Sequence, residues 1–141
     1  MGSESVNWSG FSEAEPELAQ RIRGRFDAHL HHVVGTLDSS GAPRVSGTEV
    51  RIVDDDVWLG SMVNSVKVLD LRRDPRCSIH SAPLDAEMKD GDAKLSGLAV
   101  EVTDPVDHRV LPRRGRSSGR TLAGGVVHLA DHQGGAHLGG R

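Results

Sequence analysis

The sequence predicts a mainly β fold with α elements, namely a mostly antiparallel barrel with an N-terminal helix and a short helix after the third strand. Two periodicities support this prediction. Apolar residues recur at every fourth position, at Leu18, Ile22, Phe26 and Leu30, which is the spacing of one face of a helix. From residue 32 the chain changes to short β-branched runs separated by turn-forming residues, a pattern typical of antiparallel strands.

Two helices are expected. Ser12 and Glu15 have the spacing of a capping box, so the first helix is expected over about residues 14–30. The second helix follows the third predicted strand, and its apolar residues Val66 and Leu69 mark one face.

The predicted strands are short and closely connected. The turn cluster at residues 38–41 and the acidic turn at residues 54–56 divide the chain into three strands of a meander. Further strands follow the second helix. The full set of expected strands is residues 32–37, 44–53, 57–61, 77–81 and 94–103.

The composition limits the classes of function. A chain of 141 residues forms one domain, and its net charge of −3 gives no electrostatic reason to expect nucleic acid or an anionic membrane as partner. No apolar run reaches the roughly 20 residues that a membrane span needs. The single cysteine, Cys77, excludes an internal disulfide and is interpreted as a buried small apolar residue. The expected location is the cytoplasm.

The two ends of the chain differ from its middle. Residues 1–11 are polar and are expected to be disordered. Residues 104–141, here called the tail, are rich in Gly, Arg and His and are expected to be largely irregular, because glycine loses much backbone entropy on ordering. Within the tail, only the segment at residues 124–130 has the pattern of a strand.

The turn before the second helix carries the residues that suit an anion. Ser61 and Asn64 precede the helix, Ser65 is placed at its N-cap, and Lys67 lies in its first turn. Unpaired backbone N–H groups, the helix dipole, a hydroxyl and an ammonium group together favour a phosphate. The local pattern alone is common in helices, so by itself it indicates a generic anion site.

The order of these segments resembles a known family, the pyridoxamine 5′-phosphate oxidase-like proteins with the FMN-binding split barrel, and within it the small flavin- or deazaflavin-dependent reductases. The similarity covers about residues 25–103. Its most specific part is Ser65-Val66-Lys67 followed by the Leu-Arg-Arg-Asp-Pro run at residues 71–75.

The resemblance implies a split β-barrel flavin-binding domain over residues 12–103, with FMN as cofactor. Ser65 and Lys67 would hold the phosphate, and two strand segments would lie beside the ring system. No catalytic residue is assigned, because the cofactor supplies the hydride chemistry and the protein orients it. The cofactor-binding residues implied in this way are Val45, Ser46, Gly47, Thr48, Gly60, Ser61, Met62, Ser65 and Lys67.

The resemblance also implies a homodimer that binds each cofactor at its interface and acts as an oxidoreductase on a small organic molecule. Coenzyme F-420, a deazaflavin, is an alternative cofactor. A third possibility is a non-catalytic flavin-binding protein or a damaged, frameshifted family member, since the tail departs from the family pattern. Without the usual last strand, the barrel would have an exposed edge.

Other chemistries are less well supported by the sequence. The eight histidines include His128 and His132 at helical spacing, but the surrounding residues are glycine-rich, and no metal site is predicted. His29, His31 and His32 are interpreted as the junction between the first helix and the first strand. A serine hydrolase is discounted because the chain has no G-x-S-x-G segment.

Overall fold

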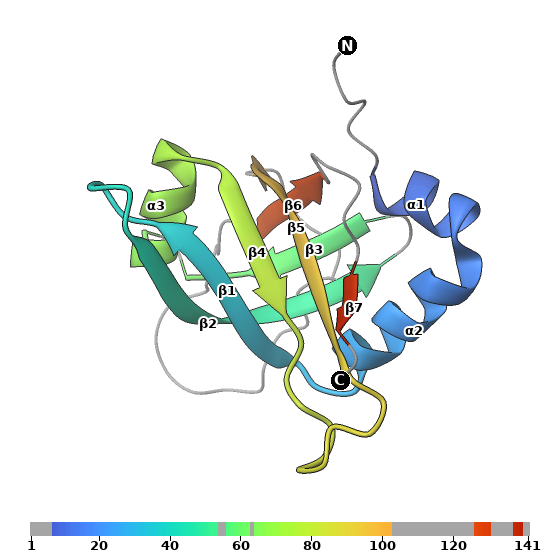
Figure 1. Ribbon diagram of the computed structural model, residues 1–141. Helices are drawn as coiled ribbons and strands as arrows, with labels where there is room; N and C mark the ends of the chain where they lie inside the picture. The colour runs from blue at the N-terminus through green and yellow to red at the C-terminus, as the bar shows by residue number, and fades with distance from the viewer. Residues whose placement is uncertain (1–6, 54–55, 63, 103–125, 131–136, 140–141) are drawn as a thin grey trace, which may run out of the picture.

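The strands form one antiparallel sheet that closes on itself (Figure 1). The computed structural model describes residues 7–53, 56–62, 64–102, 126–130 and 137–139. The strand order is β4-β1-β2-β3-β6-β5-β7, and β4 also pairs with β5, so the sheet is a barrel. The predicted fold class is confirmed.

The strands predicted from the alternating pattern are all present. The β1–β2 hairpin is closed at Asp38, whose side chain accepts hydrogen bonds from the backbone N–H groups of Ser40 and Ala42. Short connections join β2 to β3 and β3 to the third helix. The bounds are β1 His31–Leu37, β2 Pro43–Val53, β3 Asp56–Gly60, β4 Arg76–His80, β5 Asp92–Val102, β6 Val126–Ala130 and β7 His137–Gly139.

Strand β6 corrects the expectation that the barrel lacks its last strand. It lies within the tail, in the one tail segment that has a strand pattern, and pairs with β3 on one side and β5 on the other. The five-residue β3 and the eleven-residue β5 pair with its backbone groups, which outweighs the weak local preference of the flanking glycines. Residues 103–125, 131–136 and 140–141 of the tail lie outside the described residues.

The single N-terminal helix predicted over about residues 14–30 is two helices in the structure, and the first of them begins earlier than predicted. Helix α1, Trp8–Ala14, starts where disorder was expected, and the side chain of Asn7 accepts the backbone N–H of Gly10 at 2.9 Å. Ser12 is therefore not an N-cap, and its hydroxyl donates to the carbonyl of Trp8 within the helix. Helix α2, Pro16–Asp27, starts anew because proline fits the first turn of a helix but not its interior.

Helices α1 and α2 lie along one side of the barrel, as Figure 1 shows, and bury the predicted apolar stripe. Ile22 and Phe26 are fully buried, and Trp8 adds a further aromatic side chain to the core. No helix within the described ranges is both long and apolar enough to span a bilayer. The inward-facing strand residues of the core are Val34, Val50, Ile52, Val57, Leu59, Cys77, Ile79 and Ala93.

Helix α3, Val66–Arg73, packs at the opposite side of the barrel (Figure 1). The sequence marked its apolar face with Val66 and Leu69, but these side chains are 53% and 45% exposed. The buried side chains are Val68 and Leu71, with Asp70 between them. The prediction of the packing face was wrong, because the apolar pair Val68 and Leu71, which has the same i, i+3 spacing, faces the barrel together with the carboxylate of Asp70.

Asp70 makes that polar contact. Its side chain is 1% exposed, and one carboxylate oxygen accepts hydrogen bonds from the hydroxyl of Thr36 at 2.8 Å and from Nε of Arg44 at 2.7 Å. Nη1 of Arg73 lies 3.4 Å from the other oxygen. Burial alone raises the pKa of Asp70, but the hydrogen bonds from Thr36 and Arg44 and the charge of Arg44 outweigh it and hold the pKa below 3.8.

Asp70 should stabilise the protein in a pH-dependent way. Because its pKa is lower in the folded state, its contribution is complete well above pH 3.8 and is lost as the pH falls through the folded pKa. We expect Asp70→Asn to lower the free energy of unfolding near neutral pH by about 1–2 kcal/mol, since hydrogen bonds from charged groups exceed neutral ones. Urea denaturation across pH measures this, and an equal difference at pH 7 and pH 2.5 would contradict it.

Cys77 should be unreactive in the folded protein. Its side chain lies in the core, and burial raises the pKa of the thiol to about 12. The thiolate is the reactive form, so at pH 8 a disulfide reagent should modify Cys77 only as fast as the protein unfolds. Absorbance of the released thiol reports the rate, and rapid modification of the native protein would contradict the burial.

Candidate functional site

The candidate site lies along β2, where the strand extends beyond its neighbour. β2 has eleven residues and β3 has five, and β3 pairs only with Glu49–Val53. On the other side, β1 pairs with β2 over its N-terminal half. Between residues 43 and 48, therefore, β2 has no partner strand on the β3 side within the described structure. The turn after β3 and the start of α3 lie there instead.

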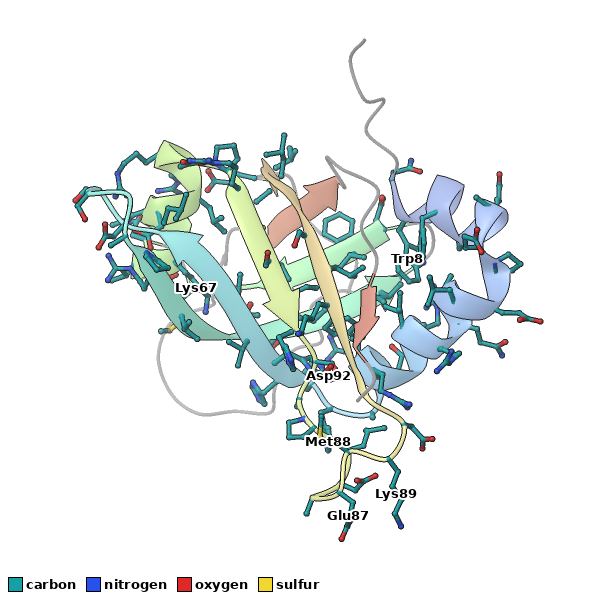
Figure 2. All side chains as sticks on the ribbon, viewed as in Figure 1. Trp8, Lys67, Glu87, Met88, Lys89 and Asp92 are labelled. Atoms are coloured by element: carbon teal, nitrogen blue, oxygen red, sulfur yellow. The ribbon has the colours of Figure 1, made fainter. Side chains whose placement is uncertain are left out.

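Lys67 connects α3 to this part of β2 (Figure 2). Its Nζ donates a 2.7 Å hydrogen bond to the carbonyl oxygen of Gly47. Partial burial lowers the pKa of the Lys67 ammonium below its usual 10.5, and the charge of Glu49 acts in the opposite direction. This contact brings together the start of α3 and residues 45–48 of β2, which the sequence analysis assigns to one site.

Ser65 is the N-cap residue of α3, as predicted, but its side chain does not cap the helix. Its hydroxyl instead forms a 2.8 Å hydrogen bond with the hydroxyl of Ser61. The first-turn N–H groups of α3 thus have no side-chain cap, and two hydroxyl groups lie beside them. Asn64, just before the cap, has a φ of 58° and occupies the left-handed region that asparagine tolerates. Hydroxyls and unpaired N–H groups at a helix start suit an anion.

Gly47 leaves open space next to these donors. Among the described residues, and apart from its own chain neighbours, no atom lies within 4 Å of a Cβ atom added at Gly47, so there is room at this point of the strand. Val45, two residues earlier, is 72% exposed, and Met62, after β3, is 60% exposed. A flat ligand can lie against this part of the strand without displacing a side chain.

The other cofactor-binding residues implied by the resemblance differ in burial and in their contacts. Thr48 is buried, and its hydroxyl donates to the carbonyl of Gly60 at 3.3 Å. Ser46 is partly buried on the same strand. The structure thus joins Lys67 to Gly47, Ser65 to Ser61 and Thr48 to Gly60, whereas Val45, Ser46 and Met62 lie nearby on the same segments.

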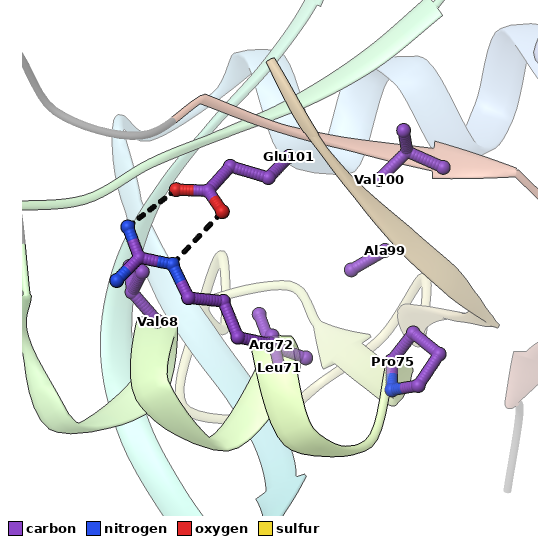
Figure 3. A pocket seen from close by; sticks show the side chains of 7 residues that line it. All are labelled: Val68, Leu71, Arg72, Pro75, Ala99, Val100 and Glu101. Atoms are coloured by element: carbon purple, nitrogen blue, oxygen red, sulfur yellow. Dashed lines mark hydrogen bonds and ion pairs between the residues drawn. The ribbon is translucent and has the colours of Figure 1, made fainter. Parts of the chain in front are cut away.

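A second depression lies between α3 and β5 (Figure 3). It has a volume of about 370 Å³ and is bordered by an ion pair in which Arg72 Nη2 and Glu101 Oε1 are 2.6 Å apart. Arg72 also donates to the side chain of Asn64, so it links this depression to the turn before α3. The local sequence pattern does not indicate the pairing of Arg72 with Glu101, which lies 29 residues away. The lining residues are Val68, Leu71, Arg72, Pro75, Ala99, Val100 and Glu101.

The histidines near β1 have a structural role, as predicted. Nδ1 of the buried His32 accepts the backbone N–H of Ala82 at 2.8 Å, so that nitrogen carries no proton. Nε2 therefore donates to the carbonyl oxygens of Phe26 and His29. The imidazole joins the end of α2 to the segment after β4.

Among the residues that the structure describes, no group of three or more His, Cys, Asp or Glu side chains is placed to hold a metal ion. The side chains of the tail histidines, His128, His132 and His137, lie outside that part.

Asp70 and Arg44 are the residues near the site that the sequence did not identify. Arg44 follows a turn, a position where a solvated side chain is common, yet it binds the buried Asp70. The one signal for Asp70 in the sequence is its position between two leucines of a short helix. A carboxylate on the buried face of a helix requires a partner, so this position indicates a buried ion pair or hydrogen bond. The partner itself is distant in sequence and cannot be identified from local pattern.

Comparisons of sequence find no relative. No family model matches the chain, and no curated protein matches it.

Solved structures similar to this chain share one fold. A Listeria innocua protein assigned provisionally as a pyridoxamine 5′-phosphate oxidase has a TM-score of 0.62 at 15% identity, over 81% of this chain and 93% of that one. HupZ from Group A Streptococcus has a TM-score of 0.62 at 17% identity, over 85% and 98%. A heme-binding protein from Mycobacterium smegmatis has a TM-score of 0.53 at 15% identity, over 79% and 50%.

These identities establish similarity of fold and no more. The neighbours are split barrels. The chain has the split-barrel fold of the pyridoxamine 5′-phosphate oxidase-like proteins.

Proposed function

We propose that this protein binds FMN along the unpaired part of β2 and is a flavin-dependent oxidoreductase. The observation that supports this most directly is the contact between Lys67 and Gly47, which brings a cation to a strand with open space above it. The uncapped start of α3 and the hydroxyls of Ser61 and Ser65 add phosphate donors at the same place.

The protein's part in the reaction would be to hold and orient the cofactor. Bound FMN supplies hydride transfer to or from a small organic substrate. Lys67 would neutralise the phosphate, and the backbone groups of residues 45–48 would hydrogen-bond to the edge of the ring. Backbone groups alternate between the two sides of a strand, so those of Val45 and Gly47 face the open side, and the pairing of β2 with β1 holds them in place before the ligand arrives.

We propose further that the protein acts as a homodimer with the cofactor at the interface. The side chains around Lys67 include several that are apolar and exposed, and such patches often mark contact surfaces. A second copy covering them would exclude water from the ring. The exposed apolar side chains are Val45, Met62, Val66 and Leu69.

Coenzyme F-420 is the alternative cofactor, since a phosphodiester meets the same donors as a phosphate monoester. Heme is a third ligand to test, because one neighbour of the same fold is a heme-binding protein. Titration of the purified protein with FMN, F-420 and hemin, followed by fluorescence quenching and absorbance, distinguishes them. Binding of none of the three, together with a cooperative thermal transition, would contradict a cofactor function.

Lys67→Met should weaken FMN binding by at least about tenfold, because hydrogen bonds between charged groups contribute about 1.5–3 kcal/mol. The matched control is Lys89→Met, which removes an exposed lysine from the loop between β4 and β5, far from Lys67 in Figure 2. Fluorescence titration gives both dissociation constants. Equal affinity for FMN in wild type and Lys67→Met would exclude Lys67 from the phosphate site.

Gly47→Ala should leave the fold intact and weaken FMN binding by about tenfold. The added methyl group enters empty space in the free protein, but it occupies the surface where the ring would lie. Gly24→Ala is the control, because Gly24 on α2 also has no atom within 4 Å of an added Cβ. Thermal melts check the fold and isothermal titration the affinity. Unchanged binding in Gly47→Ala would place the ring elsewhere.

A further inference from the structure

Helix α3 contacts β2 at two points that are one helical turn apart. Lys67 binds the carbonyl of Gly47, and Asp70 binds Nε of Arg44. Gly47 and Arg44 are separated by about 10 Å along the strand, at about 3.3 Å per residue. The helix is therefore held at two points of the strand whose free side forms the candidate site.

Apolar packing holds the buried face of α3, where Val68 and Leu71 are 1% and 8% exposed, but it does not include Val66 in the first turn. The side chains on either side of Lys67 differ in burial, since Val66 is exposed and Val68 is buried, and Leu69 in the next turn is again exposed. Asp70, in contrast, is buried and bonds to two strands at once, through Thr36 of β1 and Arg44 of β2. Hydrogen bonds have defined directions, so this pair of bonds sets both the height and the rotation of the helix.

We propose that Asp70 is a positioning residue for the phosphate site. It does not contact the ligand, because its side chain is buried beneath the helix. It holds α3 so that Lys67 and the first-turn N–H groups converge on one point beside β2. This inference rests on the proposed function and assigns to Asp70 a role that acts through Lys67.

The comparison of FMN with riboflavin isolates this role. The two ligands share the ring and the ribityl chain and differ by the phosphate alone, so the ratio of their affinities reports the phosphate site. A general loss of structure would weaken both ligands. Misplacement of Lys67 would weaken FMN only.

The main variant is Asp70→Leu, which removes both oxygen atoms. It should weaken FMN binding by at least about tenfold and change riboflavin binding by less than about twofold. Asp70→Asn should keep most of the preference for FMN, because one carboxylate oxygen accepts both strand bonds and an amide oxygen can replace it. Asp74→Leu is the control, since Asp74 ends the same helix and pairs with Arg76 instead.

A double-mutant cycle tests whether Asp70 acts through Lys67. In the Lys67→Met background, Asp70→Leu should change FMN affinity by less than about twofold, because the group that it positions is already absent. A further tenfold loss in that background would overturn the proposal. So would an unchanged ratio of FMN to riboflavin affinity in Asp70→Leu, or an equal loss for both ligands.

Two outcomes separate this inference from the proposed function. If the wild-type protein binds FMN no better than riboflavin, the phosphate site itself is wrong, and the role of Asp70 falls with it. If Asp70→Leu does not unfold cooperatively, the ratio of FMN to riboflavin affinity is measured in Thr36→Val instead. Thr36 is buried and cannot reach a ligand, and loss of its hydroxyl should reduce the preference for FMN by at least about threefold.

Discussion

The candidate site depends on the unequal lengths of two neighbouring strands. Because β3 pairs with less than half of β2, the barrel has a stretch of strand whose backbone groups are fixed by β1 and not covered by β3. Closure of the sheet on its other edges makes that stretch rigid. A missing stretch of pairing within a closed barrel produces an open backbone surface without exposing a whole edge strand.

Helix α3 then determines what chemistry the open stretch can support. Its start brings a lysine, two hydroxyls and uncapped N–H groups to the strand, and its buried carboxylate ties it to β1 and β2. Asp70 pairs with two arginines, Arg44 and Arg73, so this cluster keeps one net positive charge, and Lys67 and the helix dipole add to it beside the strand. The hydrogen bonds that attach α3 to β1 and β2 therefore belong both to the fold and to the candidate site.

Local pattern was sufficient to predict most of the strands and the placement of Ser65 before α3. Alternation and turn residues are properties of adjacent residues, so β1 to β5 can be recognised from their own segments. The N-terminal boundary was missed because the Ser12–Glu15 spacing imitates a cap, while Pro16 sets the actual start of α2.

Contacts between distant residues were beyond the reach of local pattern. Asp70 finds Thr36 and Arg44 at separations of 34 and 26 residues, and no feature of the short helix specifies either partner. Strand β6 likewise forms because β3 and β5 present complementary edges. The order of elements could be read from the sequence, whereas the rotation of α3 came only from the structure.

The late position of β6 in the chain has a consequence for how the barrel is made. Val57 of β3 pairs with Leu129 of β6, so this contact joins two of the most distant parts of the sequence. During synthesis, β1 to β5 leave the ribosome first, and the facing edges of β3 and β5 stay unpaired until residue 130 has emerged. Closing so long a loop costs chain entropy before any pairing is gained. Barrel closure is therefore expected to be the slow step of folding and the stage most exposed to edge-to-edge association.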